Sequence, residues 1–157
     1  MSQKIDTKEQ ISQIGAVVNE AGRIENILDE IIIEYYWPDA NKHYLFRRSV
    51  LNSAIMSFSA KVKVVSAIVK HEKWGKFDQT PFYKIMNIRN AFAHNDVDTK
   101  ARFDIFTLEG PEWVLSSIKN DGTYQERNRK EAFDEFLENI NLAKKQLIEI
   151  YKKAENT

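Results

Sequence analysis

Residues 80–96, TPFYKIMNIRNAFAHND, carry the pattern on which the fold prediction depends. Thr80 and Pro81 form a favourable N-cap and first-turn pair, which predicts the start of a helix. Asn95 and Asp96 predict that this helix frays there. The apolar residues between these two signals recur at three- and four-residue steps and predict one buried face, formed by Phe82, Ile85, Ile88 and Phe92.

The same periodicity predicts a long helix on the N-terminal side. A capping box at residues 7–10, TKEQ, starts this helix, which ends before Pro38. Its predicted apolar stripe consists of Ile11, Ile14, Val18, Ala21, Ile24, Leu28, Ile31 and Tyr35.

A second long helix is predicted from about Lys42 to Lys73, where Gly75 supplies the left-handed residue that commonly ends a helix. Its apolar face is expected to contain Leu45, Leu51, Ile55, Phe58, Val62, Val65 and Val69. A last helix follows the capping box at residues 123–126, TYQE, and its predicted buried face consists of Phe133, Phe136, Ile140, Ala143, Leu147 and Tyr151. These patterns predict an all-α fold with one domain over residues 1–157, built as a bundle of four main helices.

Residues 102–123 do not follow the helical pattern. The segments RFDIFTL and EWVLSSI are rich in strand-forming residues and are separated by Glu109-Gly110-Pro111. Asn120-Asp121-Gly122 is a turn signal. We expect a small hairpin or an irregular insertion between the third and fourth main helices. Trp113, within this insertion, could stack on a base, although packing explains it better.

The composition limits the classes of function. The chain of 157 residues contains no cysteine, which excludes thiol nucleophiles and cysteine-ligated zinc. His43, His71 and His94 have no metal-ligand spacing, so we expect neither a metal site nor a cofactor. The polar N-terminus and the short apolar runs predict a soluble, cytoplasmic protein without a membrane span.

Charge is unevenly distributed, although 23 Lys and Arg balance 23 Asp and Glu overall. Residues 42–76 contain eight Lys or Arg but one acid, Glu72, whereas residues 1–41 contain eight acids and three Lys or Arg. The first helix could neutralise part of this basic segment by packing alongside it. Two interpretations remain for the basic charges of residues 42–76 that are not neutralised in this way. They form either a solvated helix face or a strip that contacts phosphate.

Three polar residues of the third helix fall outside its buried stripe. Asn90 and His94 are four residues apart and lie on one face, whereas Arg89 and His94 point about 140° apart on an ideal helix. Arg89 and His94 therefore converge only if the helix ends or unwinds near Ala93. Ala91 and Ala93 leave room for a second backbone or a ligand.

This arrangement resembles the signature of the HEPN superfamily, whose motif is an Arg, four to six residues, and a His, with Asn, Asp or His commonly second. Arg89, Asn90 and His94 match it at the shortest spacing. Residues 57–65, SFSAKVKVV, are also similar to the helix that precedes this motif in relatives of the mannitol operon repressor. The resemblance covers roughly Leu45 to Asp96 and the all-helical layout.

The resemblance implies a homodimer or pseudo-dimer in which two Arg-His motifs meet across a two-fold axis. In many members of the family, toxin or defence proteins among them, the cleft between the motifs is a metal-independent endoribonuclease. Histidine can exchange a proton near neutral pH, and a guanidinium can bind phosphate oxygens in a bidentate manner. Arg89 and His94 would be catalytic, Asn90 would support them, and the products would carry a 2′,3′-cyclic phosphate. RNA is the expected partner, together with an antitoxin or regulatory protein. Further candidates for substrate binding are Lys61, Arg47, Arg48 and Asn95.

Two other interpretations stay open. His94 could simply bond the last helix carbonyls while Arg89 pairs with an acid of the first helix. The chain could also be a non-catalytic dimeric binding module for nucleic acid or protein, similar to the mannitol repressor group. Asp96 stands where toxins controlled by a nucleotidyltransferase often carry an acceptor tyrosine, so that form of control is not expected.

Overall fold

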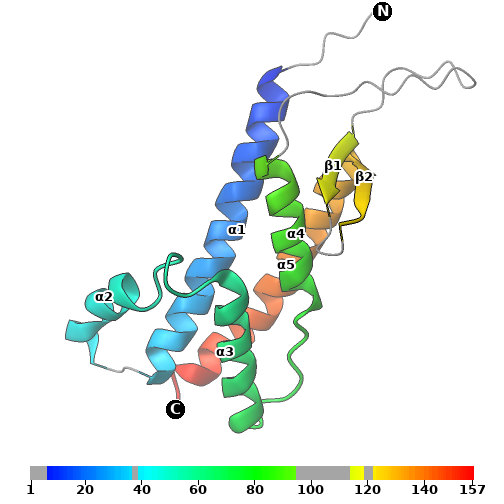
Figure 1. The fold of residues 1–157 in the computed structure, drawn as a ribbon. Coiled ribbons are helices and arrows are strands. Elements are labelled where there is room, and N and C mark those ends of the chain that lie inside the picture. Colours follow the sequence, from blue (N-terminus) through cyan, green and yellow to red (C-terminus); the bar gives the residue numbers. More distant parts are fainter. Residues whose placement is uncertain (1–6, 37–38, 95–113, 119–121) are drawn as a thin grey trace, which may run out of the picture.

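A computed structural model describes residues 7–36, 39–94, 114–118 and 122–157 (Figure 1). The chain is mostly helical, as predicted, with one short hairpin among the described residues. The elements follow in the order α1 (Thr7–Tyr36), α2 (Ala40–Ser49), α3 (Phe58–His71), α4 (Thr80–His94), β1 (Val114–Ile118), β2 (Tyr124–Asn128) and α5 (Arg129–Ala154).

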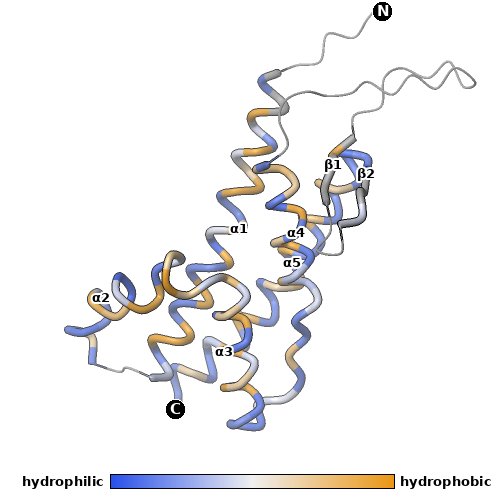
Figure 2. Tube along the Cα trace, in the orientation of Figure 1, coloured by the Kyte–Doolittle hydropathy of each residue, from blue (hydrophilic) through white to orange (hydrophobic). Residues whose placement is uncertain are grey.

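The core forms where α1, α4 and α5 pack against one another and α3 packs on α1 and α4 (Figure 1). Apolar residues recur between polar ones along each of these helices (Figure 2). The predicted stripe of α4 is buried in full, from Phe82 to Phe92. In α5, the central residues Phe136, Ile140, Ala143 and Leu147 are buried, and Phe133 and Tyr151 are partly buried.

The stripe predicted for α1 is correct at Ile14, which packs against the core, and from Ala21 to Ile31. Ala21, Ile24, Leu28 and Ile31 are buried, but Ile11 and Val18 are exposed. Val17 is fully buried in place of Val18. The predicted stripe therefore fails at Ile11 and Val18, and Val17 joins Ile14 on the side of α1 that faces the core.

The single helix predicted from Lys42 to Lys73 is wrong, because residues 50–57 separate α2 from α3. Asn52 Oδ1 accepts a hydrogen bond from the Ala54 backbone N–H at 2.9 Å. Ser57 Oγ accepts one from the Ala60 N–H at 3.3 Å and so caps α3. Short polar side chains that bond to nearby backbone in this way compete with helix continuation.

The break changes which residues of this segment are buried. Leu51 and the predicted face of α3, Phe58, Val62, Val65 and Val69, lie in the core. Leu45 and Ile55, predicted on the same apolar face, are 67% and 72% exposed. None of the residues of α2 is buried.

Lys73, rather than the predicted Gly75, is the left-handed residue that closes α3, with a φ of 56°. The Trp74 N–H donates to the Val69 carbonyl at 3.0 Å, and the Lys73 N–H donates to the Lys70 carbonyl at 3.4 Å. This is the Schellman pattern, in which glycine normally occupies the left-handed position. Gly75 also has a positive φ, 113°, but it lies two residues further on.

The two strands of the hairpin lie on either side of the turn signal at residues 120–122. The second strand lies where a helix start was predicted. β1 pairs antiparallel with β2, with Leu115 opposite Arg127. Residues 123–126 are thus no capping box, and α5 begins instead behind Asn128, whose Oδ1 accepts from the Glu131 N–H at 3.1 Å. The segment RFDIFTL and Trp113 lie outside the described residues. No helix in the described part of the chain is long and apolar enough to cross a membrane.

Candidate functional site

The last two turns of α4 carry the three residues of the Arg-His motif. Arg89 is partly exposed, and Asn90 and His94 are exposed. The Arg89 Nη1 donates a hydrogen bond to Asn90 Oδ1 at 3.1 Å. Within the described residues, Arg89 has no acidic partner and His94 has no polar partner. The motif therefore presents a guanidinium and an imidazole that no acidic side chain of the described chain contacts.

Phe92 fixes this end of α4 from the buried side. Its ring lies 6.3 Å from the ring of Phe133 on α5. The Arg129 guanidinium lies over the same ring, with its carbon 5.3 Å from the ring centroid, and Arg129 Nε donates to Gln13 Oε1 at 3.1 Å. Arg129 is thus a further cation beside the motif helix. The sequence did not single it out, because only the packing of α5 against α4 brings it there.

The helix does not unwind near Ala93 as the motif spacing required, because α4 is helical through His94. On a continuous helix, the Arg89 and His94 side chains leave the axis about 140° apart. A single copy therefore does not bring the two groups together within its described residues. Asn95 and the expected fraying at Asn95-Asp96 lie outside the described residues.

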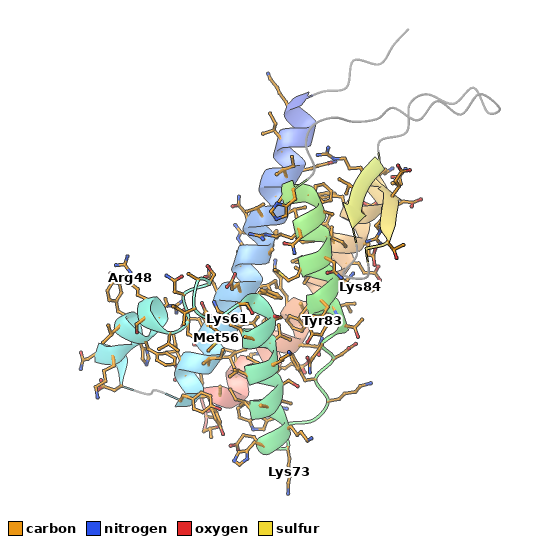
Figure 3. All side chains as sticks on the ribbon, in the orientation of Figure 1. Arg48, Met56, Lys61, Lys73, Tyr83 and Lys84 are labelled. Carbon is orange, nitrogen blue, oxygen red and sulfur yellow. The ribbon has the colours of Figure 1, made fainter. Side chains whose placement is uncertain are left out.

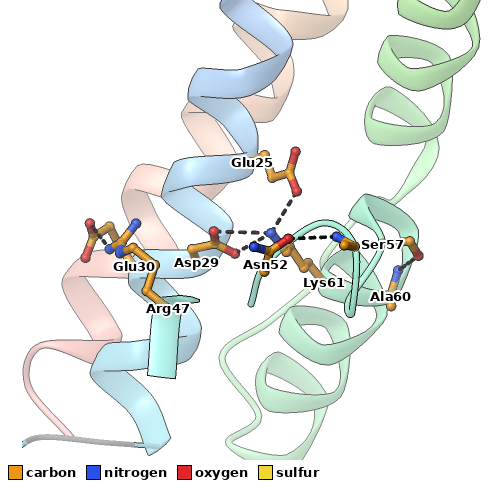
Figure 4. Close-up of polar contacts among 9 residues, drawn as sticks. Glu25, Asp29, Glu30, Arg47, Asn52, Ser57, Ala60 and Lys61 are labelled. Atoms are coloured by element: carbon orange, nitrogen blue, oxygen red, sulfur yellow. Dashed lines mark hydrogen bonds and ion pairs between the residues drawn. The ribbon is translucent and has the colours of Figure 1, made fainter. Parts of the chain in front are cut away.

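Lys61, predicted to bind substrate, lies in the core instead. It is 1% exposed and sits between α1 and α3 (Figure 4). Its Nζ donates to Glu25 Oε1 at 2.7 Å and to Asp29 Oδ2 at 3.2 Å. This placement is a correction: an ammonium already held by two carboxylates inside the protein is not available to a phosphate at the surface.

Asp29 contributes the buried half of this ion pair. Its Oδ1 lies 2.9 Å from Lys61 Nζ, an ion-pair distance, but without the angle of a hydrogen bond. Burial raises the pKa of Asp29 above its usual value, and the hydrogen bond and charge of Lys61 oppose that rise. The first helix thus neutralises part of the basic segment by packing alongside it, as the charge distribution suggested.

Arg47 and Arg48 of α2 have different surroundings. Arg47 forms an ion pair with Glu30 of α1 (Figure 4). Arg48 bonds to the Tyr44 hydroxyl, and its guanidinium carbon lies 5.2 Å from the centroid of the Tyr44 ring. Figure 3 places Arg48 on the outer side of α2, whereas Lys61 lies inside the helical body.

These candidates do not form one site. Arg47 contacts α1 at Glu30, while the end of α4 is tied to α1 near Gln13 through Arg129. Seventeen residues of helix separate those two points, which is about 25 Å at 1.5 Å per residue. The structure therefore leaves Arg89, Asn90 and His94 as one group and places the α2 residues elsewhere.

Glu135 joins the motif helix to the hairpin. It accepts from Lys84 of α4 at 3.1 Å and also pairs with Arg127 of β2. Burial alone would raise the pKa of Glu135, but the hydrogen bond from Lys84 and the charge of Arg127 outweigh it and leave the pKa lowered. Glu135 of α5 therefore ties β2 to α4, the helix that carries the motif.

Among the described residues, no group of three His, Asp or Glu side chains is arranged to hold a metal ion. No protein family, curated protein or solved structure matches this chain.

Proposed function

We propose that the chain is a HEPN-like helical domain that cleaves RNA as a homodimer without a metal. Arg89 would hold the scissile phosphate, His94 would transfer the proton, and Asn90 would orient Arg89 through the hydrogen bond between them. The biological setting consistent with such an activity is a toxin or a defence ribonuclease in the cytoplasm, with an antitoxin or regulatory protein as partner.

The observation that carries the proposal is the absence of an acidic partner for Arg89 among the described residues. Lys61 and Arg47, by contrast, pair with carboxylates of α1. An arginine whose charge is already balanced has little to offer a phosphate, whereas an unpaired guanidinium binds it bidentately. This argues against the interpretation in which Arg89 pairs with an acid of the first helix.

The chemistry follows from the two side chains. His94 would remove the proton from a ribose 2′-hydroxyl, whose oxygen then attacks the adjacent phosphorus. The bond from phosphorus to the 5′-oxygen breaks, and that oxygen takes up a proton from a water molecule on the opposite side of the phosphorus. Arg89 would stabilise the charge that develops on the phosphate oxygens. The products are a 2′,3′-cyclic phosphate and a 5′-hydroxyl.

A second copy supplies what one chain lacks. Because Arg89 and His94 diverge on the continuous helix, a two-fold arrangement would place the Arg89 of one copy opposite the His94 of the other. The N-terminal half of α1 offers a surface for this, since Ile11, Gly15 and Val18 are exposed and uncharged. Apart from the adjacent residues and the backbone of α1 itself, no described atom lies within 4 Å of the place that a Cβ would take at Gly15 or Gly22. Each glycine costs a helix interior about 1 kcal/mol relative to alanine.

One observation favours the non-catalytic alternative, a dimeric module that binds nucleic acid or a protein. A general base is normally oriented by a third group, but His94 has no polar partner within the described part of the chain. A module that only binds RNA would use Arg89 in the same way and would not depend on a proton transfer.

The test is incubation of the purified protein with single-stranded and hairpin RNA in EDTA. We expect wild-type cleavage, a loss of roughly 10²-fold or more for His94→Ala and Arg89→Ala, and products with cyclic phosphate ends. Lys145→Ala, which removes an exposed charge on α5, is the matched control. Cleavage that survives both motif substitutions would place the site elsewhere. Binding without cleavage by the wild type would select the non-catalytic module.

A further inference from the structure

Helix α2 is the least supported element of the described chain. None of its residues is buried, and it packs only on α1 among the elements that it contacts closely. In Figure 1 it stands apart from the body formed by α1, α4 and α5. A helix this short is marginal by itself in water, and α2 is held on the body through Phe46, which packs against the core, and the ion pair of Arg47 with Glu30. Its other face is left to solvent.

The outer face of α2 combines an aromatic ring with a guanidinium. Tyr44 is 67% exposed, and Arg48 lies over its ring on the outer side of the helix (Figure 3). Arg48 has no acidic partner among the described residues, in contrast to Arg47 on the inner side. Leu45, also 67% exposed, extends this face with apolar surface.

The charge of the surrounding chain indicates the kind of molecule that this face binds. No Asp or Glu occurs between Ala40 and His71. Lys42 and Arg47 of this segment pair with Asp39 and Glu30, so Arg48 is the cation that α2 offers to a partner. Aromatic rings flanked by arginine are the usual platform for single-stranded nucleic acid, because a base stacks on the ring while the guanidinium contacts phosphate.

We propose that Tyr44 and Arg48 form a contact for single-stranded RNA, separate from the Arg89 and His94 site. This inference rests on the proposed function for the identity of the ligand, but it uses other residues. Glu30 holds α2 through Arg47, and Gln13 contacts Arg129 beside the end of α4. These two residues of α1 are about 25 Å apart along the helix. The contact therefore adds affinity for the strand and takes no part in bond breaking.

The first measurement is fluorescence anisotropy with a labelled 2′-O-methyl oligonucleotide of about 16 nucleotides, within the range of known single-strand sites. This probe lacks the 2′-hydroxyl and so cannot be cleaved by the proposed chemistry. We expect Tyr44→Ala and Arg48→Ala each to weaken binding roughly tenfold, the loss typical of one stacked base. Because no residue of α2 is buried, the thermal unfolding curves should match the wild type.

Two controls match the substitutions in kind. Lys145→Ala removes an exposed charge, and Ile148→Ala removes an exposed apolar side chain, both on α5. Neither should change the affinity for the oligonucleotide. In the cleavage assay, Tyr44→Ala should raise KM and leave kcat unchanged, whereas His94→Ala should lower kcat.

The binding assay decides the inference whether or not the wild type cleaves RNA, so the two proposals can fail separately. Equal affinity of Tyr44→Ala, Arg48→Ala and the controls would overturn the RNA contact. A Leu45→Asp variant tests whether this face is instead a protein interface. If it changes the oligomeric state while the affinity for the oligonucleotide stays constant, the face binds protein, and the proposed RNA contact is overturned.

Discussion

Two cations on neighbouring helices, Lys61 of α3 and Arg89 of α4, have opposite surroundings. Lys61 is 1% exposed and is held between Glu25 and Asp29. Arg89 is partly exposed and bonds only to the neutral side chain of Asn90 among the described residues. Both residues interrupt an apolar helical pattern in the sequence, and both were candidates for binding a phosphate.

The difference between them comes from the helix that each one faces. α1 presents two carboxylates to α3 at the position of Lys61, so this charge can be buried. No described element presents a carboxylate to Arg89. A buried and paired charge is committed to the fold, because removing one partner leaves the other uncompensated. A charge that the fold does not use can serve a ligand.

The largest effect on stability is expected for Lys61→Ala. This change leaves Asp29 buried without its cation and should cost about 3 to 5 kcal/mol of unfolding free energy, as for other broken buried pairs. Urea denaturation followed by circular dichroism measures it. Lys63→Ala, an exposed lysine two residues further along α3, is the control and should stay within about 0.5 kcal/mol of the wild type. Equal losses in the two variants would show that the buried pair contributes little and would break the comparison.

Ser57→Ala tests the support of Lys61 without changing a charge. Its hydroxyl caps α3 by accepting from the Ala60 N–H, one turn before Lys61. Loss of such a cap should cost about 1 kcal/mol. The same denaturation series measures it, with Ser12→Ala, an exposed serine of α1, as control. A loss as large as that of Lys61→Ala would indicate that capping, and not the ion pair, holds α3 in place.

Glu20 provides an intermediate case, because it joins α1 to α5 near the surface. It accepts from Lys144 at 2.8 Å and pairs with Arg23. The hydrogen bond from Lys144 and the two positive charges lower the pKa of Glu20 from 4.5 despite the opposing effect of burial. Its contribution to stability is therefore present above pH 4.5 and is lost as the pH falls through the lowered folded value.

Glu20→Gln should consequently be less stable than the wild type at pH 7 by about 1 kcal/mol or less. The difference should shrink as the pH is lowered from 5 towards 3, a range of about two units around the carboxylate pKa. Denaturation at several pH values measures it, with Glu138→Gln, an exposed glutamate on α5, as control. A difference that grows on acidification would contradict the lowered pKa.

The sequence was sufficient for the elements in which local signals and burial agree. The stripe of α4, from Phe82 to Phe92, follows from periodicity and from the start signal at Thr80-Pro81, and the structure confirms it. The single helix predicted from Lys42 to Lys73 failed because side chains compete with helix continuation. Asn52 and Ser57 each bond to nearby backbone and divide the predicted second helix, and periodicity does not detect such bonds.

The candidate site was predictable only in part, because spacing shows which residues leave the buried stripe but not which residues of other helices they contact. Spacing alone identified Arg89, Asn90 and His94 as polar residues outside the buried stripe, and they lie at the accessible end of α4. It did not distinguish them from Lys61, because the carboxylates that bury Lys61 are 32 and 36 residues away in the chain. Long-range pairing of this kind depends on how α1 and α3 pack.

The smallest effect is expected for Arg89→Ala, which tests the comparison from its other side. If Arg89 serves a ligand, its removal should change the unfolding free energy by no more than about 0.5 kcal/mol. Its only partner among the described residues is Asn90, an exposed neutral group that water can satisfy when the guanidinium is absent. Urea denaturation measures the change. Lys84→Ala is the comparison, because Lys84 also lies on α4 but forms an ion pair with Glu135 of α5. Its loss of unfolding free energy shows what a cation that the fold uses contributes. An Arg89→Ala variant that loses more stability than Lys84→Ala would mean that Arg89 is held by contacts of the fold, and the case for a phosphate at this helix end would then lose its basis.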